Sequence, residues 1–388
     1  MAAIRPRDLL TEGLLERLER PGRLGRLRRP GQAGGPAGDI GQAGGLAGDI
    51  AALAEAGYLN VALPPEFGGI GCTLRQAACG QRRLARHAPD TALAVSAHLY
   101  WTGAAADAYR AGDDSVRWIL AEAAGGALFA GGHGAAGGDL RFADPRSRCE
   151  PSGEGGYRFR DPDVLSTETP AWDWIAVHAV HAVGQAGQPQ SVIAFAGRGT
   201  RCTPGFRVAR VSAAGTPAEV FTTSALTWGH SILASVQYSD ARRAFNDAIT
   251  ACAEAATPAA FAGLARPAAP ASAADVAGAA DEAGAAGGPD EADEADEAPA
   301  GSGGRPPGRP TGRWPVAEAG TLLDEMKAKI AEITHPWQLV QAPTPDLGGQ
   351  HLISLYAMRH EVAEGSATVH ALVKQLTGTA TPARPLAQ

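Results

Sequence analysis

The stretch LAEAGYLNVALPPEFGGIG, residues 53–71, says more about the fold than any other part of the chain. Its first half belongs to a pattern of apolar residues at three- and four-residue spacing that runs from Ala51 to Ala124, which is typical of amphipathic helices. Its second half, Leu63 to Gly69, gathers two prolines and two glycines, and such a cluster predicts a turn. The sequence therefore predicts an amino-terminal helical domain, residues 1–124, that is interrupted by a turn.

Upstream of this stretch the chain contains a tandem duplication. The segment GQAGGPAGDI at residues 31–40 is followed by GQAGGLAGDI at residues 41–50, and the two copies differ at one position. Stacked repeats need several units to bury a continuous face, so two copies do not make a solenoid. We therefore expect residues 31–50 to form a loop insertion between helices.

Downstream of Ala127 the apolar residues change from helical spacing to alternation. Short alternating runs, separated by turns rich in glycine and proline, are typical of strands. The expected strands are residues 157–159, 174–177, 191–195, 206–208 and 235–238. They predict a central β domain, residues 125–246, built as a small β-barrel or sandwich.

After this β domain the pattern is helical again, with a long interruption. Residues 247–254 begin a carboxyl-terminal helical domain, and residues 255–313 form a low-complexity insert rich in Ala, Gly, Pro, Asp and Glu. Such an insert has few large apolar groups to bury, so we expect it to be disordered. Two helical runs, Val316 to Ile333 and His351 to Leu376, complete a truncated bundle at 314–388. The fold class is α+β multidomain.

Composition excludes several functions. A net charge of -7 and a pI near 5.8 argue against binding to nucleic acid. No run of about 18 apolar residues predicts a membrane helix, and the amino terminus alternates Leu with Arg and Glu instead of forming a signal peptide. The five cysteines contain no CxxC pair, and His178 and His181 point to opposite faces of a strand. We expect a cytoplasmic protein without a metal site.

The order of these units, together with local motifs, resembles the acyl-CoA dehydrogenase family. Residues 53–71 are similar to the family's amino-terminal signature of a helix, an apolar step and a PEEYGGLG turn. Residues 128–139, LFAGGHGAAGGD, are similar to its aromatic-x-x-Thr-Glu-Pro-x-Ala-Gly-Ser-Asp segment, with Gly132 at the threonine position and His133 at the glutamate position.

Three later segments continue the resemblance. Residues 155–177 are similar to the DGYVLNGxKxWITNGxxADWxxV run, and residues 203–208 to the TPGVRV strand. Near the carboxyl end, Gly348-Gly349 resembles a double-glycine turn, and Glu364-Gly365-Ser366 resembles the family's Glu-Gly-Thr/Ser segment. The resemblance implies a divergent member with a shortened carboxyl-terminal bundle.

By this resemblance the protein would use FAD to desaturate an acyl thioester, carried by CoA or by a carrier protein in specialised metabolism. Glu364 would abstract the α-proton, and burial beside the substrate would raise its pKa toward the working range. The implied cofactor-binding residues are Phe129, Gly131, Gly132, His133, Val164, Leu165, Ser166, Gly348, Gly349 and Ser366. The implied substrate-binding residues are Gly138, Asp139 and Gly365. An electron-transfer partner or oxygen would reoxidise the flavin, and the chain would form a homo-oligomer.

Two other functions stay open. The family's Arg-x-x-Phe-Gly segment, which reaches a neighbouring subunit's cofactor, is missing from this sequence. Its loss and the shortened bundle favour a catalytically degenerate protein that binds a partner or serves as a scaffold. An oxygen-using flavin monooxygenase on the same architecture is the third alternative, because such relatives dispense with the glutamate base.

Overall fold

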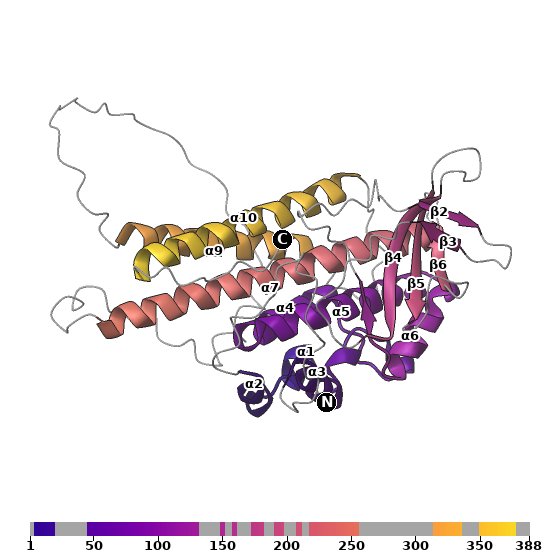
Figure 1. Ribbon diagram of the computed structural model, residues 1–388, viewed down its shortest axis with the longest axis horizontal. Helices are drawn as coiled ribbons and strands as arrows, with labels where there is room; N and C mark the ends of the chain where they lie inside the picture. Colours follow the sequence, from indigo (N-terminus) through magenta and orange to yellow (C-terminus); the bar gives the residue numbers. More distant parts are fainter. Residues whose placement is uncertain are drawn as a thin grey trace, which may run out of the picture.

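The protein is built around one long helix, as the computed structural model in Figure 1 shows. The structure describes residues 4–19, 45–131, 148–151, 157–160, 172–181, 190–197, 207–211, 217–255, 313–335 and 349–377. Helix α7, Pro217–Ala255, begins at the sheet and runs along most of the molecule. The amino-terminal helices lie on one side of α7, and α9 and α10 lie on the other.

The amino-terminal helices follow the predicted pattern. They are α1 (Pro6–Leu9), α2 (Glu12–Leu18), α3 (Leu46–Glu55), α4 (Leu74–His87), α5 (Pro89–Arg110) and α6 (Arg117–Ala124). Helix α4 starts with a capping box: Gln76 N–H donates to Thr73 Oγ1 at 3.3 Å, and Thr73 N–H donates to Gln76 Oε1 at 2.9 Å. The predicted turn is also present, as a short 3₁₀ helix at Pro65–Phe67. Helix α5 packs along α4 and α7 and is buried over most of its surface.

The loop expected at residues 31–50 is wrong for its last residues. Leu46 to Ile50 form the first turn and a half of α3, while residues 31–44 lie outside the described part. Thr91 Oγ1 donates to Asp49 Oδ2 at 3.0 Å, and both residues are buried. Ile50 is buried in the same core. Tertiary contacts therefore hold the end of the second copy in a helix.

The described strands form one mixed sheet. They are β1 (Phe129–Ala130), β2 (Arg148–Pro151), β3 (Tyr157–Arg160), β4 (Trp174–His181), β5 (Gln190–Gly197) and β6 (Arg207–Val211). The order is β3-β2-β4-β5-β6, and β1 pairs with β4 in parallel. Antiparallel pairs join β2 to β3, β4 to β5 and β5 to β6, whereas β2 runs parallel to β4. Four of the five predicted strands are confirmed, in a single sheet instead of an evident barrel or sandwich.

The fifth predicted strand, Ser235 to Tyr238, is wrong because these residues lie in the middle of α7. All four are buried, since α7 is enclosed by α4 and α5 on one side and by α9 and α10 on the other. A helix that is buried all round loses the apolar stripe that marks a surface helix. Without an apolar stripe, the alternation of Ser, Val, Gln and Tyr in this part of α7 resembled the pattern of a strand.

Helices α9 (Arg313–Thr334) and α10 (Gly349–Thr377) confirm the two helical runs predicted near the carboxyl end. With α7 they enclose a second apolar cluster, separate from the one around α5. The insert expected to be disordered lies outside the described residues, apart from Ala255 and Arg313 at its edges. The division of the chain into domains stays a prediction. The described helices include none that is apolar over the length needed to cross a membrane.

Candidate functional site

The predicted site residues fall into two groups in the structure. Phe129 lies in β1 and Gly131 directly follows it, whereas Glu364, Gly365 and Ser366 lie inside α10. Gly349 is the first residue of α10. The first group belongs to the cluster around α5, and the second lies in the bundle formed by α7, α9 and α10. The other predicted residues lie outside the described part: Gly132, His133, Gly138, Asp139, Val164, Leu165, Ser166 and Gly348.

Gly131 is fixed by two side chains of α5. Its carbonyl oxygen accepts hydrogen bonds from Tyr100 Oη at 2.5 Å and from Trp101 Nε1 at 2.9 Å. Its φ of 78° is left-handed, and a Cβ at this position would lie 2.6 Å from the carbonyl oxygen of Ala176. Glycine alone adopts this φ without strain and leaves room for the Ala176 carbonyl. The backbone at the end of β1 is therefore held in place by α5.

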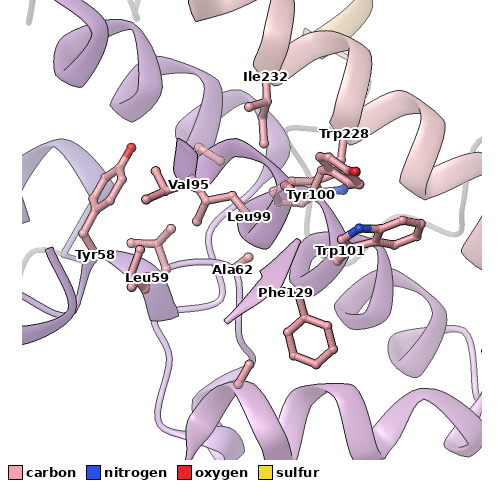
Figure 2. Close-up of a cluster of buried hydrophobic side chains, with 14 of the residues drawn as sticks. Tyr58, Leu59, Ala62, Val95, Leu99, Tyr100, Trp101, Phe129, Trp228 and Ile232 are labelled. Carbon is pink, nitrogen blue, oxygen red and sulfur yellow. The ribbon is translucent and has the colours of Figure 1, made fainter. Parts of the chain in front are cut away.

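The ring of Phe129 is a core side chain. It is 2% exposed and packs edge-on against Phe195 of β5, with ring centroids 5.6 Å apart. Trp118 of α6 contacts both rings. Figure 2 shows Tyr100, Trp101, Phe129 and Trp228 gathered in this part of the core. Phe129 therefore positions the backbone of β1, and its contact with a cofactor stays a prediction.

His98 of α5 joins two distant segments and is held neutral. Its Nε2 lies 3.0 Å from the carbonyl oxygen of Leu59, and its Nδ1 lies 3.3 Å from the backbone N–H of Phe129. The carbonyl requires a donor and the N–H requires an acceptor, so the proton is on Nε2. Burial lowers the pKa of His98 to about 4. Both ring nitrogens are thus used by the fold.

Glu364 is not buried, contrary to the expectation for a general base. Its side chain is 67% exposed, and its carboxylate lies 3.3 Å from Nε2 of the exposed His360, one turn earlier. The residue lies inside α10, within the helical run predicted from His351 to Leu376. The buried face of α10 instead carries Val362, Ser366 and Val369. The proton-abstracting role of Glu364 stays a prediction.

The two residues after Glu364 hold α10 against its neighbours. A Cβ on Gly365 would lie 3.0 Å from Sδ of Met326, so α9 approaches α10 closely there. The carbonyl oxygen of Ser366 accepts a hydrogen bond from Nδ1 of His370 at 2.8 Å, and Nε2 of His370 lies 3.3 Å from Asp240 of α7. Burial disfavours the charged ring of His370, but these bonds and the charge of Asp240 outweigh it and raise its pKa. The Gly-Ser pair thus has a structural role in the bundle.

Besides Asp240 with His370, two more hydrogen-bonded pairs join α7 to α10, and sequence reasoning missed them. Thr227 of α7 accepts a hydrogen bond from Nε2 of His351 at 3.0 Å, because its own hydroxyl proton goes to the carbonyl oxygen of Thr223. Two turns further, Arg359 Nη1 donates to Oε1 of Gln237. We call the part of the contact between these two pairs the α7–α10 seam.

Between these two hydrogen-bonded pairs, His230 of α7 lies against Tyr356 of α10. His230 is 1% exposed, and neither of its ring nitrogens has a hydrogen-bond partner among the residues that the structure describes. Its ring packs edge-on against Tyr356 of α10, with centroids 5.0 Å apart. Burial and the nearby Arg359 lower the pKa of His230 to about 3, so the ring is neutral. Leaving a buried polar group unpaired costs about 1–3 kcal/mol. No sequence signal distinguished His230 from an apolar bundle residue.

The described residues contain no cluster of three or more His, Cys, Asp or Glu side chains that could hold a metal ion. His178 and His181 both lie in β4, where their side chains are outside the described part.

No protein-family profile matches the sequence, and no curated protein matches it with significance. Solved structures do match. KijD3 in complex with dTDP is 18% identical, with a TM-score of 0.57, over 87% of this chain and 81% of that chain. Dibenzothiophene monooxygenase TdsC from Paenibacillus sp. A11-2 is 14% identical, with a TM-score of 0.55, over 87% and 81%. A nitrososynthase from Micromonospora carbonacea var. africana is 17% identical, with a TM-score of 0.55, over 86% and 79%.

These structures share the fold of the acyl-CoA dehydrogenases, so the architecture expected from the resemblance is confirmed at the level of the fold. KijD3 and TdsC have also been solved with FMN, and XiaF from Streptomyces sp., another protein of this fold, with FADH2. At these identities the likeness shows a fold that flavin-dependent enzymes use.

Proposed function

We propose that this protein is a flavin-dependent oxidoreductase, and that it uses oxygen as a monooxygenase. The observation that carries the second part is the exposure of Glu364, whose carboxylate lies in water beside His360. A base that takes a weakly acidic α-proton needs a dry, enclosed position next to its substrate. A monooxygenase has no need of this carboxylate.

The comparisons support the same choice. TdsC is named a monooxygenase, and KijD3 was solved with FMN and an amino-keto sugar linked to dTDP. In a monooxygenase the reduced flavin supplies two electrons to oxygen, one oxygen atom enters the substrate, and the other leaves as water. We propose that a separate reductase provides the reduced flavin, and that FAD, the cofactor expected from the sequence, competes with FMN for this role.

The described residues fit a flavin site in two respects. Gly131, directly after β1, is held by hydrogen bonds from Tyr100 and Trp101. The seam offers buried polar atoms, on His230 and Arg359, that have no partner among the described residues. The polar atoms of the seam would orient a ligand, and the aromatic cluster around Phe129 keeps the end of β1 rigid.

The acyl-thioester dehydrogenase is the second candidate. Glu364-Gly365-Ser366 favours it as a sequence motif, and another copy of the chain covering α10 would supply the missing enclosure. Its partner would be an acyl group on CoA or on a carrier protein. A protein that folds without binding any flavin would instead be the degenerate binding protein.

Two assays separate these candidates. The first measures oxygen uptake and product formation with reduced FMN or FAD and candidate amines, thioethers or aromatic substrates. The second measures bleaching of bound oxidised flavin by acyl thioesters. Each is made on the wild type, on Glu364→Gln, and on Glu361→Gln, a matched control on the same helix whose partner is Lys329.

The monooxygenase predicts substrate-dependent oxygen uptake that Glu364→Gln and Glu361→Gln leave within about twofold, which is a change of about 0.4 kcal/mol in the barrier. Flavin bleaching by acyl thioesters that Glu364→Gln abolishes, and Glu361→Gln does not, would instead establish the dehydrogenase.

A further inference from the structure

The middle of the α7–α10 seam has the properties of a small binding site. Its polar atoms are enclosed and come from two different helices: the two ring nitrogens of His230 on α7, and Nε of Arg359 on α10. Arg359 follows Tyr356 by three residues on α10, so it lies on the same helix face as the ring that contacts His230. The pairs on either side, Thr227 with His351 and Gln237 with Arg359 Nη1, are hydrogen-bonded. Other buried side-chain atoms without a hydrogen-bond partner lie along α7, on Ser224, Ser231, Ser235, Ser239 and Arg243, and in the described part of the chain Arg359 supplies such an atom from α10.

We propose that this level of the seam binds an anionic oxygen group, a phosphate or a carboxylate, of a small-molecule ligand through Arg359 and His230. The proposal stands on contacts within one chain and does not depend on the flavin function proposed above.

The positive charge of Arg359 favours the binding of an anion. In the described part of the chain, no carboxylate lies within ion-pair distance of Arg359. Asp240 on α7 is engaged by His370 and Arg243, and Glu361 on α10 is engaged by Lys329. Gln237 supplies a neutral oxygen only. A largely buried guanidinium needs compensation by an opposite charge, so a neutral ligand would leave it uncompensated.

The donors at this level match an oxyanion. Arg359 Nε–H is enclosed and unpaired, and the neutral ring of His230 adds one N–H. Two donors on facing helices, one of them charged, suit two oxygens of one phosphate or carboxylate. A metal ion or an ammonium group would be repelled by the guanidinium.

The surface above this level provides a way in. Tyr356, whose ring packs on His230, is 37% exposed, and Ile353 beside it on α10 is 64% exposed. The imidazole therefore lies one side chain below the surface. Rotation of the Tyr356 ring away from His230 would open the level to a ligand, and its closure would exclude water.

The test uses the full chain and inorganic phosphate as the probe. Thermal unfolding is followed in phosphate, in acetate and in sodium chloride, all at equal ionic strength. The wild-type midpoint should rise and saturate with phosphate or acetate but not with chloride, because a ligand that binds only the folded state stabilises it by mass action. In Arg359→Met this rise should disappear. In His230→Leu the apparent affinity should fall roughly tenfold, as expected for the loss of one hydrogen bond to a charged group.

Two further variants keep the result interpretable. Lys329→Gln removes a positive charge from the same bundle, at an exposed position on α9, and should keep the full response. Arg359→Lys keeps the charge without the planar fork and should respond weakly, which protects the test if Arg359→Met folds poorly. Comparing FMN with riboflavin then shows whether the anion is the flavin's own phosphate or belongs to another ligand.

A wild-type midpoint that responds no more to phosphate and acetate than to chloride would overturn the proposal. An unchanged phosphate response in both Arg359 variants would overturn it as well, since the anion would then bind elsewhere.

Discussion

Two buried histidines, on neighbouring long helices, have opposite surroundings. His98 of α5 uses both ring nitrogens, toward Leu59 and Phe129, and thereby joins β1 and the turn after α3 to the core. In the described part of the chain, His230 of α7 has no hydrogen-bond partner for either ring nitrogen. Both rings are neutral because burial lowers the pKa of each. The difference indicates that the ring nitrogens of His98 serve the fold, whereas those of His230 add no hydrogen bond to it.

Replacing His98 should have the largest effect. His98→Leu removes the partner of the Leu59 carbonyl and of the Phe129 N–H together, and both groups stay buried. At about 1–3 kcal/mol for each unpaired group, we expect a loss of about 4 kcal/mol in the free energy of unfolding. Urea denaturation measures this change. A loss below about 1 kcal/mol would mean that the two bonds do not anchor β1.

The contact of α5 with α7 should be nearly as sensitive. A Cβ on Gly103 would lie 2.4 Å from the indole ring of Trp228, whose Nε1 is fixed by Asp107 at 2.8 Å. Gly103→Ala should therefore destabilise the protein by about 3 kcal/mol or more, through overpacking. Gly320→Ala in α9 is the matched control, because nothing lies within 4 Å of its Cβ position. That variant should be stabilised by about 0.5–1 kcal/mol. Equal effects in the two variants would contradict the close packing of α5 on α7.

The acid sensitivity of the protein should reveal both histidines. Their folded pKa values, about 4 and about 3, lie below the ordinary value of 6.5, so the unfolded chain binds more protons between these limits. The stability due to each neutral ring is complete above pH 6.5 and is lost as the pH falls. Each ring should contribute a slope of about 1.4 kcal/mol per pH unit between pH 6.5 and its folded pKa.

His230→Leu removes one of the two slopes, so its unfolding free energy should fall less steeply with acid than that of the wild type. Burial raises the pKa of Asp107 to about 6, which acts in the opposite direction, but this group is common to both proteins and cancels in the difference. Urea unfolding at several pH values between 4 and 7 provides the measurement. Parallel curves for the two proteins would show that His230 titrates normally and is accessible to water.

The smallest effect should come from His230 at neutral pH. His230→Leu removes two unpaired buried nitrogens and a ring contact with Tyr356 worth about 1 kcal/mol. These changes oppose each other, so the unfolding free energy at pH 7.5 should stay within about 1 kcal/mol of the wild type. A loss as large as that of His98→Leu would remove the contrast between the two histidines.

Much of the fold could be predicted from local sequence. Helical spacing located α4 to α6, α9 and α10, and alternation located four strands. The prediction from local spacing failed at Ser235 to Tyr238. A helix that is enclosed on every side has no polar face, so its sequence does not show the helical period. The prediction failed again at Leu46 to Ile50, where the reason for the helix is a contact with Thr91, far along the chain.

The site was harder to predict, because its contacts also join residues that are far apart in the sequence. The partners of His98 are 31 and 39 residues away, and those of Gly131 are 30 and 31 away, so no local pattern reveals them. The exposure of Glu364 did have a signal. Val362, Ser366 and Val369 form the buried stripe of α10, and a residue two positions after Val362 lies off that stripe. The resemblance of Glu364-Gly365-Ser366 to the family motif instead predicted a buried base at this position.

The most direct test of the proposed function is a titration of the purified protein with FMN and with FAD, followed by the visible absorbance and fluorescence of the flavin. The account predicts saturable binding of at least one flavin, one per chain, with faster oxygen uptake by the reduced complex when substrate is present. A folded protein that binds neither flavin, oxidised or reduced, would contradict the account and leave a binding protein on a flavoenzyme fold.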